Sequence, residues 1–162
     1  MFQWLTTSQA GHLLLTLLIS AVPVIELRGG IPYGIAQGAN PWLVFAASVI
    51  GNMLPVPFIL LFIEKVLEWM KKTRLFHGFA EWLEKKATGP KAEKIRKVEF
   101  LGTLLFVGIP LPGTGAWTGA LIVSLLHVDR KKASIAILLG ILLAATIMCV
   151  ITYLIPWIIR QF

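Results

Sequence analysis

The sequence predicts an all-α integral membrane protein, with a single membrane domain over residues 1–162. Of these residues 57% are hydrophobic and 14% charged, whereas about 25% are charged in soluble domains. Four stretches contain no Asp, Glu, Lys or Arg: residues 1–25, 29–63, 100–128 and 133–159. Each stretch reaches the roughly 20 residues that a helix needs to cross a bilayer.

Residues 1–63 predict a re-entrant helical hairpin followed by a membrane span. An apolar run over residues 9–25 is interrupted at Glu26–Pro32 by two charges, two glycines and a proline, where the chain should lie in lipid. Proline inside a helix removes a hydrogen bond and collides with the preceding turn. We therefore expect the helix to break at Glu26–Pro32 and the chain to return, before a span over about residues 42–63. A direct contact between Glu26 and Arg28 would require the chain to unwind at Gly29-Gly30.

Residues 64–99 predict a cytoplasmic amphipathic helix that joins the two halves of the chain. The segment holds ten Lys or Arg residues and six Glu residues, and apolar side chains recur in it at helical spacing. Aromatic anchors surrounded by lysines suit the surface of a membrane. A solvated linker helix without lipid contact is the alternative.

Residues 100–162 predict a second hairpin, broken at Gly108–Gly115, and a span over about residues 133–159. Non-helical backbone at membrane depth persists only where protein or a water-filled cavity covers it, which favours a re-entrant hairpin. A hairpin adds no net crossing and a span adds one, so we expect the second repeat to be inverted relative to the first. Inverted repeats whose broken helices meet at the midplane are typical of transporters.

The distribution of basic residues predicts the orientation, because cytoplasmic loops carry the excess of Lys and Arg. If residues 100–127 return to the side from which they enter, both residues 64–99 and the turn at Asp129–Lys132 face the cytoplasm. Thirteen of the fifteen Lys and Arg residues then lie inside. We assign the net charge of +7 to contacts with anionic lipid headgroups, and we expect no nucleic-acid partner.

Glu26 and Arg28 are the main candidates for a substrate or ion site, since ionisable groups at membrane depth usually mark a transport pathway. The Arg28 guanidinium offers a planar set of donors that suits a phosphate or a carboxylate. Glu26 could pair with Arg28 when the site is empty, or could carry a coupled proton. The alternative is that both residues end a helix at the outer surface of the membrane.

The other candidate site residues lie in or beside the two breaks. They are Gly29, Gly30, Pro32 and Tyr33 in the first half, and Pro110, Pro112, Gly113, Thr114, Gly115 and Trp117 in the second. Thr114 and the amides beside it could line a polar site, or the prolines and glycines could only shape a turn. Tyr33 and Trp117 fit either a pathway lining or a headgroup anchor. We expect Asn52 to make one interhelical hydrogen bond and His12 to lie at the membrane interface.

The sequence contains no recognisable catalytic set. No Ser/His/Asp arrangement, carboxylate pair or metal-binding cluster is visible, so we expect no enzyme activity, no metal and no cofactor. A structural or regulatory membrane subunit would need no charges at the hairpin break, so Glu26 and Arg28 argue against that class.

The phrase from Glu26 to Pro32, followed far downstream by Pro110-Leu-Pro-Gly-Thr-Gly-Ala-Trp117, resembles the small multidrug export family of bacterial and archaeal membrane proteins. That family is similar to the DedA superfamily, whose members share two re-entrant hairpins, each followed by a span. The resemblance implies a multi-pass protein of the cell membrane that translocates a lipid carrier such as a lipid phosphate, with proton coupling. Glu26 matches the acidic residue of the DedA first hairpin, but this chain has no arginine in its second hairpin.

The function predicted from these features is translocation of an anionic lipid or lipid-phosphate carrier. Proton-coupled efflux of small drugs or cations is the alternative, because cations bind aromatic faces and carboxylates. The acidic residue here is accompanied by an arginine, which favours an anionic headgroup. Two hairpins and two spans do not easily enclose a polar site alone, so we expect membrane lipids as partners and a homo-oligomer, most simply a dimer.

Overall fold

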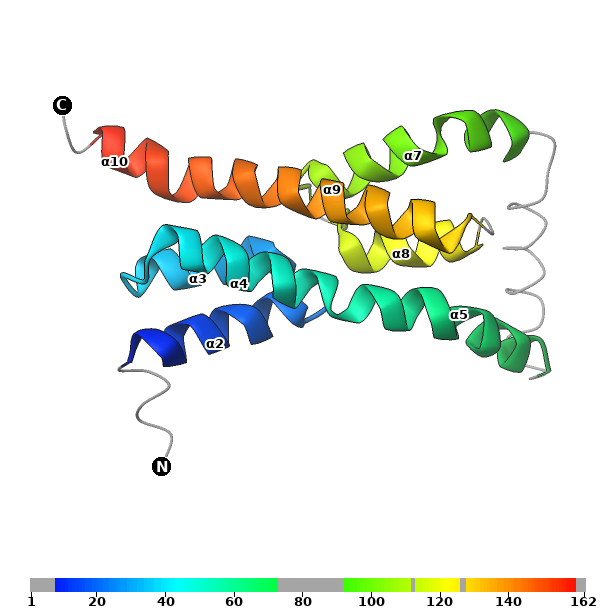
Figure 1. Ribbon diagram of the computed structural model, residues 1–162, viewed down its shortest axis with the longest axis horizontal. Coiled ribbons are helices and arrows are strands. Elements are labelled where there is room, and N and C mark those ends of the chain that lie inside the picture. The colour runs from blue at the N-terminus through cyan, green and yellow to red at the C-terminus, as the bar shows by residue number, and fades with distance from the viewer. Residues whose placement is uncertain (1–7, 73–91, 112, 126–127, 160–162) are drawn as a thin grey trace.

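The computed structural model describes residues 8–72, 92–111, 113–125 and 128–159, and all regular structure in these ranges is helical (Figure 1). The helices in chain order are α2 (Gln9–Ala21), α3 (Glu26–Ala36), α4 (Pro41–Met53), α5 (Pro55–Lys72), α7 (Ala92–Gly108), α8 (Ala116–Leu125), α9 (Arg130–Cys149), the π-helix η1 (Val150–Leu154) and α10 (Ile155–Ile159).

Two long helical stretches run the length of the molecule. The first combines α4 with α5 and the second combines α9, η1 and α10, while the shorter helices α2, α3, α7 and α8 pack beside them (Figure 1). Pro41–Phe62 and Arg130–Ile159 are long and apolar enough to cross a bilayer. The predicted spans are therefore present as helices.

Polar caps define where three of the helices begin. Ser8 Oγ accepts a hydrogen bond from Gly11 N at 3.1 Å at the start of α2, and Asn40 Oδ1 accepts one from Trp42 N at the start of α4. Asp129 Oδ1 accepts from Lys131 N and Lys132 N, both at 3.0 Å, at the start of α9. Each cap satisfies amide groups that a first helical turn leaves unpaired.

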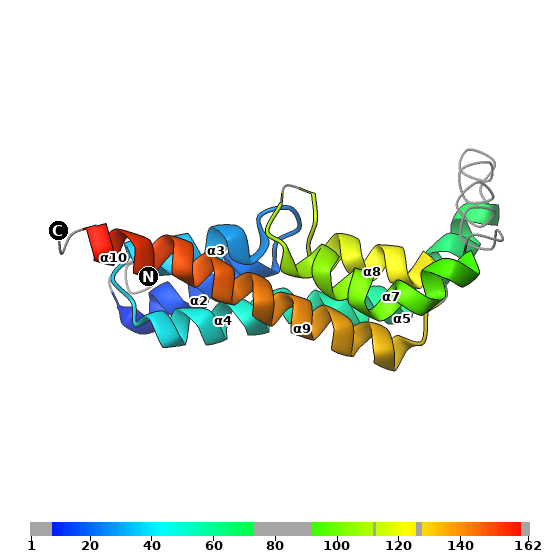
Figure 2. The same ribbon diagram turned by 90° about the horizontal axis from the view of Figure 1, so that it is seen from above.

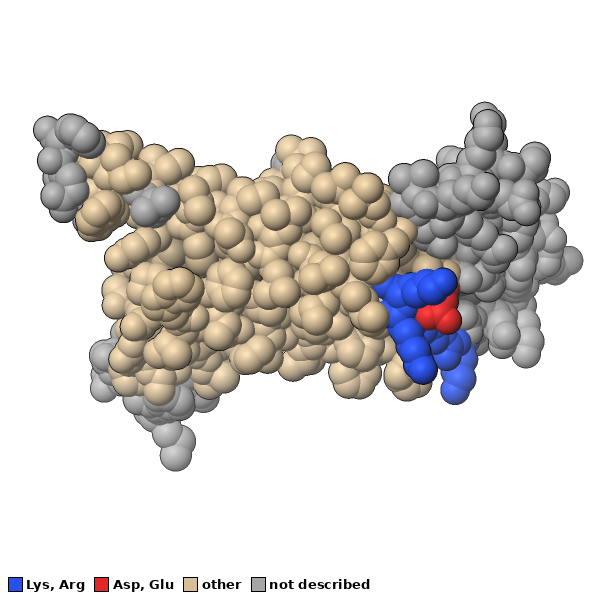
Figure 3. Space-filling model, turned by 45° about the horizontal axis from the view of Figure 1, so that its top comes forward, with Lys and Arg blue, Asp and Glu red and all other residues tan. Residues whose placement is uncertain are grey.

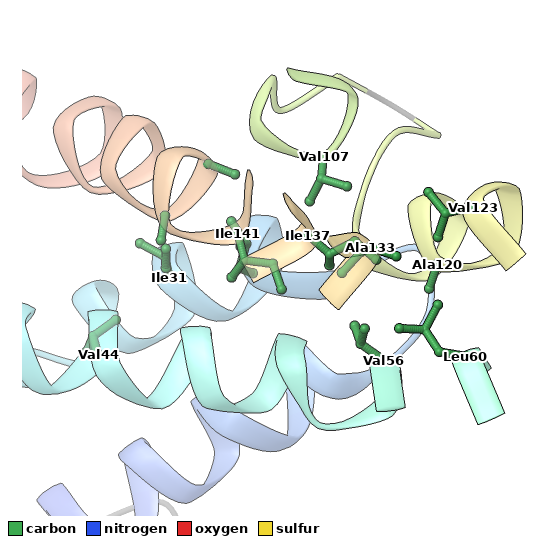
Figure 4. Close-up of a cluster of buried hydrophobic side chains, with 14 of the residues drawn as sticks. Ile31, Val44, Val56, Leu60, Val107, Ala120, Val123, Ala133, Ile137 and Ile141 are labelled. Atoms are coloured by element: carbon green, nitrogen blue, oxygen red, sulfur yellow. The ribbon is translucent and has the colours of Figure 1, made fainter. Parts of the chain in front are cut away.

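The core runs along the contact between the long stretches and the shorter helices. Figure 4 shows Ile31 and Val44 in one half, Val56 and Leu60 in α5, and the α9 side chains around Ile137 between them. Alanines of α8 and α9 bring these helices close together, so one continuous core joins the two halves.

The outer surface is apolar. Large side chains lie exposed along both long stretches, with Trp42 82% exposed and Phe58, Phe62, Ile151 and Trp157 also on the surface. On the face shown in Figure 3, the described charges gather at one end and the rest of the described surface carries none. Monomeric soluble proteins rarely expose apolar surface on this scale, so the structure indicates a membrane protein.

The first helix break lies earlier than the sequence predicts. The chain leaves the helix at residues 22–25, whereas Glu26–Pro32 forms the first turns of α3. Pro23 sits in the true break, where Val24 adopts a φ of 73° and Glu26 a φ of 51°. The prediction of a break at Glu26–Pro32 is therefore wrong, and the chain does not unwind at Gly29-Gly30. These glycines serve packing, because a Cβ on Gly30 would collide with Ser20 Oγ of α2.

Parts of the linker predicted over residues 64–99 belong to the neighbouring helices. Helix α5 continues to Lys72, and α7 already begins at Ala92. Residues 73–91 lie outside the described residues, and with them most of the predicted amphipathic helix. The end of α5 and the start of α7 lie at the same end of the molecule as the start of α9 (Figure 1).

Candidate functional site

The two helix breaks lie side by side. Figure 2 shows the loop between α2 and α3 next to the loop between α7 and α8, near the middle of the long axis of the molecule. The second break covers residues 109–115, close to the predicted Gly108–Gly115. The sequence segments with the candidate residues therefore meet in space, although 80 or more residues separate them.

Glu26 lies at the N-terminus of α8. It is the first residue of α3 and only 4% exposed, and its Oε1 accepts a hydrogen bond from Trp117 N at 3.2 Å. The carboxylate packs against Gly115, where an added Cβ would collide with Oε2. Unpaired amides and the helix dipole favour an anion at a helix N-terminus, so α8 is a suitable partner for this buried charge.

Arg28 reaches the same break from the first turn of α3, two residues after Glu26. Its Nη2 donates to the Thr114 carbonyl oxygen and, at 2.9 Å, to Thr114 Oγ1. Thr114 Oγ1 also lies 2.8 Å from the carbonyl oxygen of Ile109 and 2.9 Å from that of Leu111. The hydroxyl thus holds the second break in shape, and Thr114 presents two acceptors, its carbonyl oxygen and its Oγ1, to the half-buried guanidinium.

Trp117 makes a third link between the breaks. Its indole Nε1 donates to the carbonyl oxygen of Ala21, the last residue of α2, at 3.2 Å. We call the contact between the two breaks that Ala21, Glu26, Arg28, Thr114 and Trp117 make through these hydrogen bonds the junction.

Glu26 and Arg28 do not pair with each other. Both are described, and no ion pair within 4 Å joins them; each makes its hydrogen bonds to the second break instead. Their side chains leave α3 two residues apart, a spacing that does not face two groups toward each other on a helix. The hypothesis that Glu26 is the partner of Arg28 in the empty site is therefore wrong in this conformation.

Asn52 lies beside the candidate site, whereas the sequence predicts only one interhelical hydrogen bond for it. Its side chain is buried at the end of α4 and lies within hydrogen-bonding reach of the Glu26 carboxylate. Its Oδ1 has no hydrogen-bond partner. The spacing of Ser48 and Asn52, two polar residues one helical turn apart in an apolar span, is the signal that could have pointed to it.

The remaining candidates lie at varying distances from the junction. Gly29 packs on Ile25 in the first break, and Gly113 has a φ of 82° that suits a glycine in the second. Pro32 and Tyr33 lie farther along α3, and no hydrogen bond joins the Tyr33 side chain to the junction. Pro110 is half-buried in the second break, whereas Pro112 lies outside the described residues.

A methyl group at residue 115 should disturb the junction. We expect Gly115→Ala to displace the Glu26 carboxylate from α8 and to lower the stability by about 1–3 kcal/mol, as overpacking typically does. The measurement is thermal unfolding in mild detergent. Gly102→Ala on α7 is the matched control, because no atom lies within 4 Å of its added Cβ. Equal midpoints for the two variants would contradict the packing of Glu26 on Gly115.

Comparison with known proteins identifies a family. Residues 26–147 match the family described as "Putative small multi-drug export protein". No curated protein and no solved structure matches the chain. The matched region covers three quarters of the sequence and runs from Glu26 through the second break into α9, so it includes Glu26, Arg28, Thr114 and Trp117. The chain therefore belongs to the small multi-drug export protein family.

Proposed function

We propose that the protein is a membrane transporter that translocates an anionic lipid or a lipid-phosphate carrier, in a DedA-like manner and coupled to protons. The observation that carries the proposal is the convergence of the Arg28 guanidinium and the N-terminus of α8 at the junction of the two breaks. Both groups favour an oxyanion. The family description supports the broader conclusion that the protein exports a substrate.

The buried carboxylate suggests how substrate and proton are exchanged. Glu26 occupies the N-terminus of α8 as an internal anion, held by Trp117 N. A proton on Glu26 would remove the charge that makes this hydrogen bond strong. The amides of α8 would then be free to receive a phosphate, with Arg28 turning from Thr114 to the same group. Loss of the proton would return Glu26 to α8 and release the substrate.

The membrane arrangement in this proposal follows the two long stretches. Pro41–Phe62 and Arg130–Ile159 would cross the bilayer, and the helix pairs α2–α3 and α7–α8 would enter from opposite sides and return as re-entrant hairpins. The two breaks would then meet near the midplane, as in transporters built from inverted repeats. At that depth an unpaired ionisable group is costly, which agrees with the polar contacts of Glu26 and Arg28.

Efflux of small cationic drugs is the second candidate, and the family description favours it. A drug cation would have to bind the Glu26 carboxylate, which is buried and already bonded to α8. It would also approach the positive end of that helix and the Arg28 guanidinium. These charges favour an anionic headgroup over a cation.

Reconstitution into liposomes separates the two candidates. We expect the purified protein to move a fluorescent lipid phosphate between leaflets when a pH gradient is imposed, and to leave a cationic dye untransported. Empty liposomes and liposomes with the Arg28→Ala variant are the controls. Gradient-driven uptake of the cationic dye without lipid-phosphate movement would contradict the proposed substrate class and favour efflux of small cations.

The proposal fixes the orientation in a bacterial or archaeal plasma membrane. The basic start of α9 lies at the same end as the end of α5 and the start of α7 (Figure 1), so this end should face the cytoplasm. In a Cys149→Ala background, an impermeant thiol reagent should label Gln37→Cys in intact cells, whereas Lys131→Cys should react only after permeabilisation. Labelling of both residues from outside would contradict the orientation.

A homodimer is proposed to cover the breaks. Val24 is 89% exposed in the first break, and Gly113 is exposed in the second. Exposed polar backbone facing lipid costs several kcal/mol per unsatisfied group, roughly. We expect native mass spectrometry in mild detergent and in nanodiscs to give a two-fold dimer. A monomer in both environments would count against it.

A further inference from the structure

Five polar side chains are buried where α2 packs on α3 and α4. His12, Thr16 and Ser20 follow one another at intervals of one helical turn on α2, and Ser48 and Asn52 do the same on α4. All five are buried, and α2 packs on both α3 and α4. We call this set the polar row. It is unexpected in a helix pair whose other residues are mostly apolar.

Four atoms of the polar row have no protein partner. They are His12 Nδ1, Ser20 Oγ, Ser48 Oγ and Asn52 Oδ1. A buried polar atom without a hydrogen bond is destabilising, and water is the usual partner where protein supplies none. Four such atoms on α2 and α4 therefore point to hydration sites where these helices pack.

Other Ser and Thr hydroxyls on the helices of this protein do form hydrogen bonds. Thr16, Ser124 and Thr146 each donate to the carbonyl oxygen one turn earlier on their own helix, at 2.7–2.8 Å. Ser20 and Ser48 make no such bond, although their helices offer the same acceptor. Their hydroxyls thus remain available to another partner.

The polar row leads from one end of the molecule to the candidate site. His12 lies near the start of α2, at the end of the molecule where α10 lies, and α2 and α4 run from that end toward the middle (Figure 1). Asn52 lies at the inner end, within hydrogen-bonding reach of Glu26. The direction of the row is therefore from the membrane surface to the buried carboxylate.

We propose that the polar row is the proton-access path to Glu26, in which water molecules bonded to its side chains link the carboxylate to the outer solution. This inference rests on the proposed function, because it supplies the protons for coupling. A proton enters at the His12 end, and each water molecule of the path receives one proton and passes one on. The Glu26 carboxylate accepts the last proton and becomes a carboxyl group.

Few other titratable groups border this path. Within the bounds of α2, His12 is the one ionisable side chain; α3 adds Glu26, Arg28 and Tyr33, and α4 adds none. Arg28 bonds to the second break, on Thr114. The stretch of the path along α2 and α4, from His12 to Asn52, therefore contains no Lys or Arg.

Thiol accessibility tests the path without any substrate. In a Cys149→Ala background, we expect Ser48→Cys to react with a small water-soluble thiol reagent about tenfold faster than Ala145→Cys, since only position 48 adjoins the hydration sites. Ala145 is the matched control because both native residues are 0% exposed. Equal rates would overturn the path, because Ser48 would then be as dry as the apolar core.

A second measurement connects the path to coupling. Ser48→Val should fill the row and slow lipid-phosphate movement driven by a pH gradient by about tenfold, while equilibration without a gradient stays at the wild-type rate. Ser48→Ala, which adds no volume, should fold if Ser48→Val does not, and should show a smaller loss in the same direction. Wild-type coupling in both variants would overturn the inference.

The outcomes also separate this inference from the proposed function. Slow labelling of Ser48→Cys in a protein that moves lipid phosphate would reject the path and leave the function standing. Fast labelling in a protein that moves no lipid phosphate would support the hydrated row and reject the proposed substrate.

Discussion

Arg28→Ala should lower lipid-phosphate movement in proteoliposomes by at least about thirtyfold, the equivalent of roughly 2 kcal/mol for a truncated charge pair. Arg28 donates to two acceptors of Thr114 and is the cation nearest the N-terminus of α8 among the described residues. Without it, a phosphate at the junction would meet only amide groups. The measurement is the initial rate of leaflet exchange at equal protein density.

Three variants control for indirect effects of this substitution. Arg28→Lys should also fail, because a lysine supplies a point charge and cannot bind two acceptors in the planar geometry of a guanidinium. Thr114→Ser keeps the hydroxyl that holds the second break and should keep most activity. Lys131→Ala removes an exposed cation at the end of the molecule and should have no effect. Normal transport by Arg28→Ala would contradict this role and would support the alternative that Glu26 and Arg28 only end a helix.

Glu26→Gln should abolish the response of transport to a pH gradient. The carboxamide can still accept a hydrogen bond from Trp117 N, so the fold of the junction should persist, but it can neither bind a proton nor place a negative charge at α8. We expect the gradient-driven rate to fall at least about tenfold, to the rate without a gradient. The measurement compares both rates in the same liposomes.

The same variant has a structural control. Its unfolding midpoint should stay close to that of the wild type, in contrast to Gly115→Ala, which displaces the side chain. A Glu26→Gln protein that still responds fully to the gradient would show that another group carries the coupled proton.

The long helices and the second break could be predicted from the sequence because their signals are local. Charge-free stretches of sufficient length become helices, and the prolines and glycines of residues 108–115 end α7 and start α8 where expected. Glu26, Arg28, Thr114 and Trp117 could also be selected, because charges and breakers are rare in apolar runs.

The first break and the partners of the charged residues could not be predicted in this way. Gly29-Gly30 reads as a flexible point, but the close approach of α2 makes glycine necessary inside a regular helix. Val24 adopts a left-handed φ that a β-branched residue rarely tolerates, so no local preference reveals it. The contacts of Glu26 with α8 depend on how the two halves pack, and spacing along the chain carries no such information.

Binding of lipid phosphate to the junction is measured most directly by native mass spectrometry of the protein released from nanodiscs. The wild type and the Lys131→Ala variant should retain the added lipid phosphate, whereas Arg28→Ala should lose it under the same conditions. Retention of equal amounts by Arg28→Ala and the wild type would contradict the assignment of the junction between the two helix breaks as the anion site.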